Sequence, residues 1–309
     1  MCPANTDPDV YALATLELAG QPCAAIFTAG AYWPLLRTGY RGSSDLTVMT
    51  LLESWDRSFE QLSLHARACG AGAIARELSV SAAHAQALSP LRHPRKIVGV
   101  AFNYGSQLRE MGLPVKPFRP AAFFVRPASN TLVGPGEPVR MPQGDGLDWE
   151  IEIGAVIGRR MHHVSADDGL RGVAGYTVAV DMTVRDLAGV SEVFKTDLFR
   201  GKCQDGLSPI GPLLTPAAFV PDPHDLRLRL SVNGQMKQDE SSSDMLISIG
   251  ELISEASRYI TWEPGDLLLT GTPAGTSGKS GQFLRPGDRV HAQIETLGDF
   301  EFPIEPRLG

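Results

Sequence analysis

The sequence has no long apolar run and no run of basic residues, and each absence excludes a class of protein. No apolar stretch approaches the roughly 20 residues that span a bilayer, so we expect no membrane partner. Acidic residues outnumber basic ones and give a formal net charge of -7. Such a surface repels phosphodiester backbones, so we expect no nucleic-acid partner.

Cysteines are few: 4 in 309 residues, scattered and without C-x-x-C spacing. This pattern argues against a zinc site and against a disulfide framework. The first residues also lack the basic start and apolar core of a secretory signal. These features predict a cytoplasmic location.

The composition is otherwise that of an ordinary globular protein, with 43% hydrophobic and 20% charged residues. The length suits a small domain followed by a larger one. Because the pattern changes near residue 93, we expect a small N-terminal domain over residues 1–92 and a catalytic domain over residues 93–309.

The N-terminal part combines strand-like and helical patterns. Residues 11–18 and 24–28 are strand-like, and residues 90–94 resemble a linker. Apolar residues at steps of four and three predict an amphipathic helix, which Asp45 caps and which ends near Gly70. These residues are Val48, Leu52, Trp55, Phe59 and Leu62.

From residue 96 onward, short apolar runs separated by Gly and Pro predict a strand-rich chain. The runs are 97–101, 121–125, 151–157, 173–180, 226–232, 266–269 and 290–295. One helix interrupts them, because Ser248 and Glu251 form a capping box before an apolar stripe that must stop before Pro264. The fold class is therefore α+β and β-rich.

Two glutamates and an aspartate indicate a metal site. Glu150 and Glu152 are two residues apart, so on a strand they project from the same face. A third acid, Asp181, ends the apolar run 173–180. A solvated strand face is the alternative, but the apolar run that follows Glu152 favours burial. Oxygen ligands alone suit Mg²⁺, with Mn²⁺ or Ca²⁺ as alternatives.

The order of these motifs resembles the fumarylacetoacetate hydrolase superfamily, especially its acylpyruvase and oxaloacetate decarboxylase-like branch. The similarity covers residues 96–306. Its matching stretches include Asn103-Tyr104, Arg126-Pro127, Asp148 to Gly158, Arg185-Asp186, Gly201-Lys202, Asp205, Pro264-Gly265-Asp266 and Thr270-Gly271-Thr272-Pro273. The resemblance implies a mixed β-sandwich or roll, a homodimer, and a variable small N-terminal domain.

The resemblance also implies roles for individual residues. It assigns the metal to Glu150, Glu152 and Asp181 and names Lys202 as an active-site lysine. The substrate contacts that it implies are Tyr104, Arg126, Arg185, Asp205, Gly271 and Thr272. The substrate would be a small oxo-acid that chelates the ion and passes through an enolate, whose charge the metal and Lys202 stabilise.

Two positions depart from the family pattern. Hydrolytic members resemble one another in N-Y-x-x-H-x-x-E, whereas this chain has Gln107 at the histidine position and keeps Glu110. An amide can position water but cannot take up a proton near neutral pH, so either Glu110 acts as base alone or the reaction needs no activated water. Family members also often have R-D-x-Q, where this chain has Ala188.

The sequence therefore supports three hypotheses. The first is a Mg²⁺-dependent hydrolase that cleaves a C–C bond in a 2-oxo acid or 1,3-dicarbonyl of the acylpyruvate type. The second, favoured by Gln107, is a decarboxylase, tautomerase, isomerase or hydratase that uses the same enolate. The third is a catalytically silent binding relative.

Overall fold

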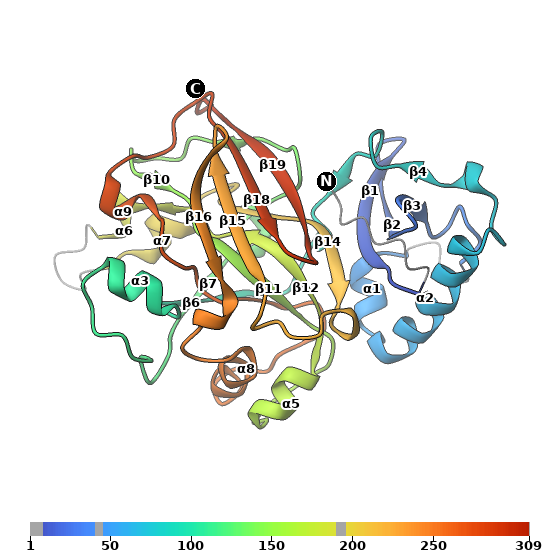
Figure 1. Cartoon of the computed structure of the whole chain (residues 1–309), viewed down its shortest axis with the longest axis horizontal. Coiled ribbons are helices and arrows are strands. Elements are labelled where there is room, and N and C mark those ends of the chain that lie inside the picture. The colour runs from blue at the N-terminus through green and yellow to red at the C-terminus, as the bar shows by residue number, and fades with distance from the viewer. Residues whose placement is uncertain (1–8, 41–45, 190–195, 309) are drawn as a thin grey trace.

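A computed structural model describes residues 9–40, 46–189 and 196–308 as two packed β-sheets with short helices around them (Figure 1). The larger sheet has 12 strands, ten of them in the order β4-β3-β2-β1-β14-β12-β11-β17-β6-β7; β5 pairs with β1 and β8 with β14. Their bounds are β1 (Ala12–Leu18), β2 (Gln21–Thr28), β3 (Ala31–Pro34), β4 (Val80–Ser81), β5 (Ala87–Leu88), β6 (Ile97–Ala101), β7 (Ala122–Arg126), β8 (Leu132–Val133), β11 (Ile151–Ile157), β12 (Val173–Val180), β14 (Ser208–Pro216) and β17 (Leu267–Leu269).

The second sheet has five strands in the order β16-β15-β18-β19-β9. Their bounds are β9 (Val139–Arg140), β15 (Arg227–Val232), β16 (Gln235–Ser241), β18 (Arg289–Ile294) and β19 (Gly298–Glu305). Apolar side chains of β11 and β12 meet those of β15, β18 and β19 in one buried cluster, which forms the core of the sandwich. A two-stranded ribbon pairs β10 (Leu147–Asp148) with β13 (Thr183–Val184).

The helices form three groups (Figure 1). Next to the N-terminal strands lie α1 (Val48–Leu52) and α2 (Trp55–Gly70), and a second pair is α5 (Ala166–Arg171) and α8 (Ile249–Ala256). The third group gathers at one end of the sandwich: α3 (Gly105–Glu110), α6 (Arg185–Ala188), α7 (Leu198–Lys202) and α9 (Ser277–Ser280). A further short helix is α4 (Ala128–Thr131). Within the described ranges, no helix has the length and apolar character to cross a membrane.

The capping box at α8 is confirmed. The Ser248 side chain accepts a hydrogen bond from the backbone of Glu251, whose side chain accepts one from the backbone of Ser248. The predicted helix near residue 48 is instead two helices, because Glu53 ends α1 and Ser54 begins α2. Asp45 lies outside the described residues, and Thr47 forms the capping box of α1 with Thr50.

The N-terminal strands belong to the same sheet as the later ones. β1 pairs with β14 at Leu13 and Leu214, and the apolar side chains of α1 and α2 share a cluster with β11 and β17 residues. Leu91, in the predicted linker, is fully buried. The predicted class is confirmed as a strand-rich α+β fold with a small N-terminal region, while the boundary at residue 92 stays a prediction.

Candidate metal centre and substrate pocket

Three carboxylates meet at the ends of β11 and β12. The two strands are antiparallel with Ile151 opposite Val180, so Glu150 and Asp181 face each other, and the Asp181 N–H donates to the Glu150 carbonyl at 2.8 Å. Glu152 lies one strand repeat further on the same face. One carboxylate oxygen from each residue lies within 4.8 Å of the others, and all three residues are buried. This is the cluster that the spacing predicts.

Lys202 lies among these acids. Its Nζ donates to Glu150 Oε2 at 3.0 Å, to Thr183 Oγ1 at 2.7 Å and to Asp181. The ammonium also lies 4.9 Å from the centre of the Phe124 ring. Burial lowers the pKa of Lys202, and the neighbouring Glu150 opposes that shift. α7 therefore brings a cation to the predicted metal ligands.

Two arginines add further positive charge beside these acids. Arg185 donates to Asp148 Oδ2 at 2.7 Å and to Glu150, and one third of its side chain is exposed. Arg126 is fully buried, pairs with Asp181 and donates to the carbonyl of Leu207 at 2.8 Å. Arg185, a predicted substrate contact, is therefore partly open to solvent. Arg126, the other arginine predicted to contact the substrate, is buried and binds the Asp181 carboxylate.

The surroundings shift the pKa values of the two glutamates in opposite directions. Burial tends to raise the pKa of Glu150, but Lys202 and Arg185 outweigh it and lower that pKa. Burial, together with the charge of Glu150, raises the pKa of Glu152 to about 8. Glu152 is thus the acid whose charge the neighbouring cations compensate least. A hard divalent cation fits this donor set, because three oxygens of buried carboxylates are the ligands that it prefers.

A loop after β17 lies beside Glu152. The Gly271 N–H donates to Glu152 Oε2 at 2.7 Å, and Gly271 has φ +90° with a hypothetical Cβ only 2.9 Å from Asn103 Cβ, so only glycine fits there. Thr272 Oγ1 donates to the Ile151 carbonyl at 2.8 Å. In this arrangement the hydroxyl has no hydrogen left for a substrate carboxylate, and the predicted contact of Thr272 stays a prediction.

A cavity of about 430 Å³ opens beside this centre. Its lining includes Gln107 and Glu110 of α3, Arg185, and, from elsewhere, Phe102, Met111, Thr276 and Gly278. The side-chain Oε1 of Gln107 is buried without a hydrogen-bond partner, and Glu110 Oε2 accepts from the Gly275 N–H at 3.2 Å. Arg185 lines this cavity together with the two predicted catalytic residues of α3, and it also pairs with Glu150 of the carboxylate cluster.

The remaining predicted residues lie in two places. Tyr104 is fully buried, and burial together with the charge of Glu152 raises the pKa of its phenol. Asp205 is exposed, and it accepts a hydrogen bond from Asn130 at 2.7 Å. Tyr104 thus lies close to the centre, while Asp205 is on the surface.

Sequence reasoning missed Asp148 and Gln238. Asp148 is fully buried; it binds Arg185 and accepts from the Ser277 N–H at 2.8 Å. Gln238, also buried, accepts from the Ile151 N–H at 3.0 Å. The position of Asp148, two residues before Glu150, could have indicated its role, but no local pattern marks Gln238.

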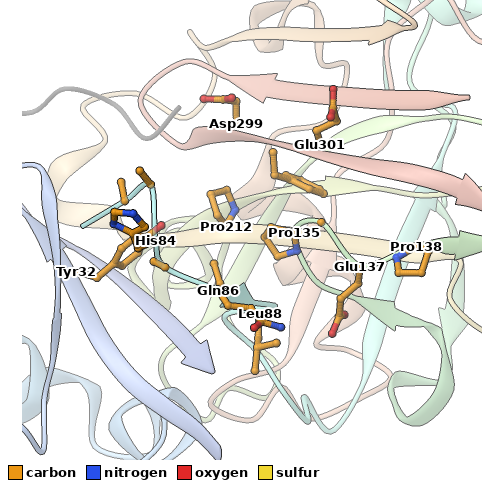
Figure 2. Close-up of a pocket in the computed structure, with 16 residues that line it drawn as sticks. Tyr32, His84, Gln86, Leu88, Pro135, Glu137, Pro138, Pro212, Asp299 and Glu301 are labelled. Carbon is orange, nitrogen blue, oxygen red and sulfur yellow. The ribbon is translucent and has the colours of Figure 1, made fainter. Parts of the chain in front are cut away.

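A larger cavity, of about 1080 Å³, lies between the N-terminal region and β19 (Figure 2). Its lining contains none of the predicted site residues. Its acids have partners: Asp299 with His291 at 2.9 Å, Glu301 with Arg289, and Glu137 with the Gly134 N–H at 2.6 Å. The smaller cavity, by contrast, is lined by the predicted residues Gln107, Glu110 and Arg185, and Arg185 also contacts Glu150.

Residues 96–305 match a family model described as fumarylacetoacetate (FAA) hydrolase C-terminal. The mitochondrial oxaloacetate tautomerase fahd2 of Xenopus laevis is 36% identical over 220 residues, which cover 70% of this chain and 67% of that protein.

Two solved structures share the fold. Fumarylacetoacetate hydrolase from Exiguobacterium antarcticum has a TM-score of 0.78 at 27% identity, covering 96% of this chain and 100% of that one. Maleylpyruvate hydrolase from Sphingobium sp. SYK-6, solved with manganese(II) and pyruvate, has a TM-score of 0.77 at 24% identity with the same coverage. At the latter identity the likeness shows the fold alone.

Proposed function

The chain belongs to the fumarylacetoacetate hydrolase family, and on that premise we propose that it is a divalent-metal-dependent enzyme that interconverts the keto and enol forms of a 2-oxo acid. The observation that carries this proposal is Gln107, which lies in the pocket at the position where hydrolytic members resemble one another in having histidine. The tautomerase activity in the name of the Xenopus relative supports the same reading.

Glu150, Glu152 and Asp181 would hold the ion. When bound, the ion supplies Lewis-acid polarisation of the 2-oxo group, which is worth several kcal/mol of barrier. Lys202 places a second positive charge against Glu150 and Asp181, where it stabilises negative charge on the substrate oxygen. Arg185 faces the pocket and offers its guanidinium to a carboxylate.

Glu110 is the base in this proposal. Tautomerisation breaks the C3–H bond and forms an O–H bond at the C2 oxygen, so it consumes no water. One carboxylate oxygen of Glu110 accepts from the Gly275 N–H, and the other is available for the C3 proton. The Gln107 amide can hold the substrate but cannot take up a proton. Among the described residues that line the pocket, Glu110 is the one base, and it would take the C3 proton and return it to the C2 oxygen.

Hydrolytic C–C cleavage is the second candidate. The named activity of the Exiguobacterium protein, 27% identical to this chain, supports it. In this reaction Glu110 alone would have to activate water, without the histidine whose general-base help is typically worth about 10²–10⁴-fold. For this reason we rank it after tautomerisation.

Product analysis in ¹⁸O-water separates the two candidates. The protein would be incubated with Mg²⁺ and, in turn, oxaloacetate, an acylpyruvate and a ring-cleavage oxo-acid. We expect faster loss of the enol absorbance and no cleavage product, and Glu110→Gln should slow that loss by about 10²–10⁴-fold. A cleavage product with label in its new carboxylate would instead establish hydrolysis.

Three finer points belong to the same proposal. We infer that Mg²⁺ is the physiological ion, although the Sphingobium enzyme was solved with manganese(II). We also infer a homodimer, which light scattering of the purified protein tests. The cytoplasmic location stays a prediction, and the Xenopus relative is mitochondrial.

A further inference from the structure

The backbone between the two metal-binding glutamates lacks a strand partner on one side. β17 ends at Leu269, which pairs with Gly154 of β11, so the ladder stops before it reaches Ile151. Unpaired N–H and C=O groups in a buried strand must find other partners. The Ile153 carbonyl accepts a hydrogen bond from the Thr270 hydroxyl at 3.0 Å.

The backbone N–H and carbonyl of Ile151 each form a hydrogen bond with a side chain. Its N–H donates to Gln238 Oε1 at 3.0 Å, and its carbonyl accepts from Thr272 Oγ1 at 2.8 Å. Because Ile151 is the residue between Glu150 and Glu152, a rotation of its peptide groups would turn both carboxylates. These two contacts therefore hold the peptide groups of both ligands on the side that β12 does not pair.

Gln238 comes from the other sheet. It lies on β16 and is only 1% exposed. The register of β15 against β16 shifts next to it, since Leu230 pairs with Gln238 and Ser231 with Met236, which leaves Lys237 as an extra residue. Such a bulge redirects the neighbouring side chain, and bulges recur next to active sites.

The amide nitrogen of the same side chain holds the loop after β17. Gln238 Nε2 lies 2.9 Å from Thr272 Oγ1, 3.0 Å from the Pro273 carbonyl and 3.3 Å from the Ala274 carbonyl. The next residue, Gly275, packs so closely on Lys237 that a Cβ would lie 2.1 Å from the Lys237 carbonyl oxygen.

We propose that Gln238 is a positioning residue that links the metal ligands to the substrate loop. Its carbonyl oxygen orients Ile151, and with it Glu150 and Glu152. Its amide N–H groups fix the loop whose Gly275 N–H binds Glu110. This inference rests on the proposed metal-dependent function, and it assigns to one buried amide two roles that can be separated.

Two variants separate the roles. Gln238→Met keeps the length of the side chain but removes both the acceptor and the donors. Gln238→Glu keeps an acceptor for the Ile151 N–H and loses the donors to the loop. Gln235→Met is the matched control, because Gln235 lies on the same strand and is exposed.

The first measurement is calorimetric titration of each folded variant with Mg²⁺ alone. Partners of metal ligands typically contribute about 10–100-fold to affinity, so Gln238→Met should raise the Kd at least 10-fold, with no change for Gln235→Met. Gln238→Glu should bind Mg²⁺ no more weakly than the wild type. Its KM for the oxo-acid should rise several-fold, because the loop is no longer held.

The outcomes are distinguishable. If the wild type itself binds no divalent ion, the proposed function fails. If the wild type binds Mg²⁺ and folded Gln238→Met binds it equally well, the role of Gln238 is refuted. Should Gln238→Met not fold, Gln238→Glu decides: a 10-fold weaker Kd overturns the proposal, and an unchanged Kd with a raised KM supports it.

Discussion

Replacing Glu152 by Gln should change how the stability of the metal-free protein depends on pH. Burial and the charge of Glu150 raise the pKa of Glu152 from 4.5 to about 8. We therefore expect the metal-free protein to hold a proton on Glu152 at neutral pH, and a glutamine resembles that neutral form in size and charge. The variant should fold normally and lose the ability to bind the ion.

The size of the effect follows from the pKa shift. A rise in pKa from 4.5 to about 8 corresponds to several kcal/mol, since each tenfold change in proton affinity is worth about 1.4 kcal/mol. The folded protein holds this proton more tightly than the unfolded chain does, so the stabilisation is complete below pH 4.5 and is lost as the pH rises through about 8. Between pH 5 and 8 the wild type should lose on the order of a few kcal/mol more than Glu152→Gln.

The assay is urea unfolding in EDTA at several pH values, followed by tryptophan fluorescence. Saturating Mg²⁺ should remove the extra pH dependence from the wild type, because the ion binds the ionised carboxylate, and should have no effect on Glu152→Gln. Glu60→Gln, an exposed change on α2, is the control and should follow the wild type. If the wild type and Glu152→Gln lost stability in parallel as the pH rises, the Glu152 carboxyl would not be the source of the pH dependence.

Three further changes test neighbouring groups. Lys202→Met should lower kcat by about 10²-fold or more, which steady-state kinetics measures. It should not weaken Mg²⁺ binding, since it removes a cation that lies among the ligands, and calorimetry measures the Kd. Asp148→Asn should destabilise the fold by about 1–3 kcal/mol, because it weakens the pair with Arg185, and urea unfolding measures this. Gln107→His should add a base to the pocket and raise any ¹⁸O incorporation into a cleavage product by up to about 10²–10⁴-fold; no rise would show that this position does not limit hydrolysis.

The carboxylate cluster could be predicted because its signal is local. Glu150 and Glu152 follow the two-residue repeat of a strand, and Asp181 directly follows another apolar strand. The capping box of α8 is local in the same way. The spacing alone does not show that the antiparallel register of β11 and β12 places Asp181 opposite Glu150.

Other elements could not be predicted because their partners are distant in the chain. β14 contains Pro209, Pro212 and Pro216, which normally exclude a central strand, yet it is buried between β1 and β12. β16 is polar, lacks an alternating pattern and lies at a sheet edge. Gln238 on β16 is 87 residues from Ile151, so only the packing of the two sheets reveals its role.

We infer that the three buried carboxylates hold a divalent ion on which proton transfer in an oxo-acid depends. The most direct test follows, in one Mg²⁺ titration, both ion binding and the rate at which enol-oxaloacetate becomes the keto form, with a blank of Mg²⁺ alone. We predict that the rate above the blank rises in proportion to the occupied sites and falls to the blank with EDTA. A folded protein that binds Mg²⁺ at these residues and leaves the rate at the blank value, or that is equally active in EDTA, would contradict the account.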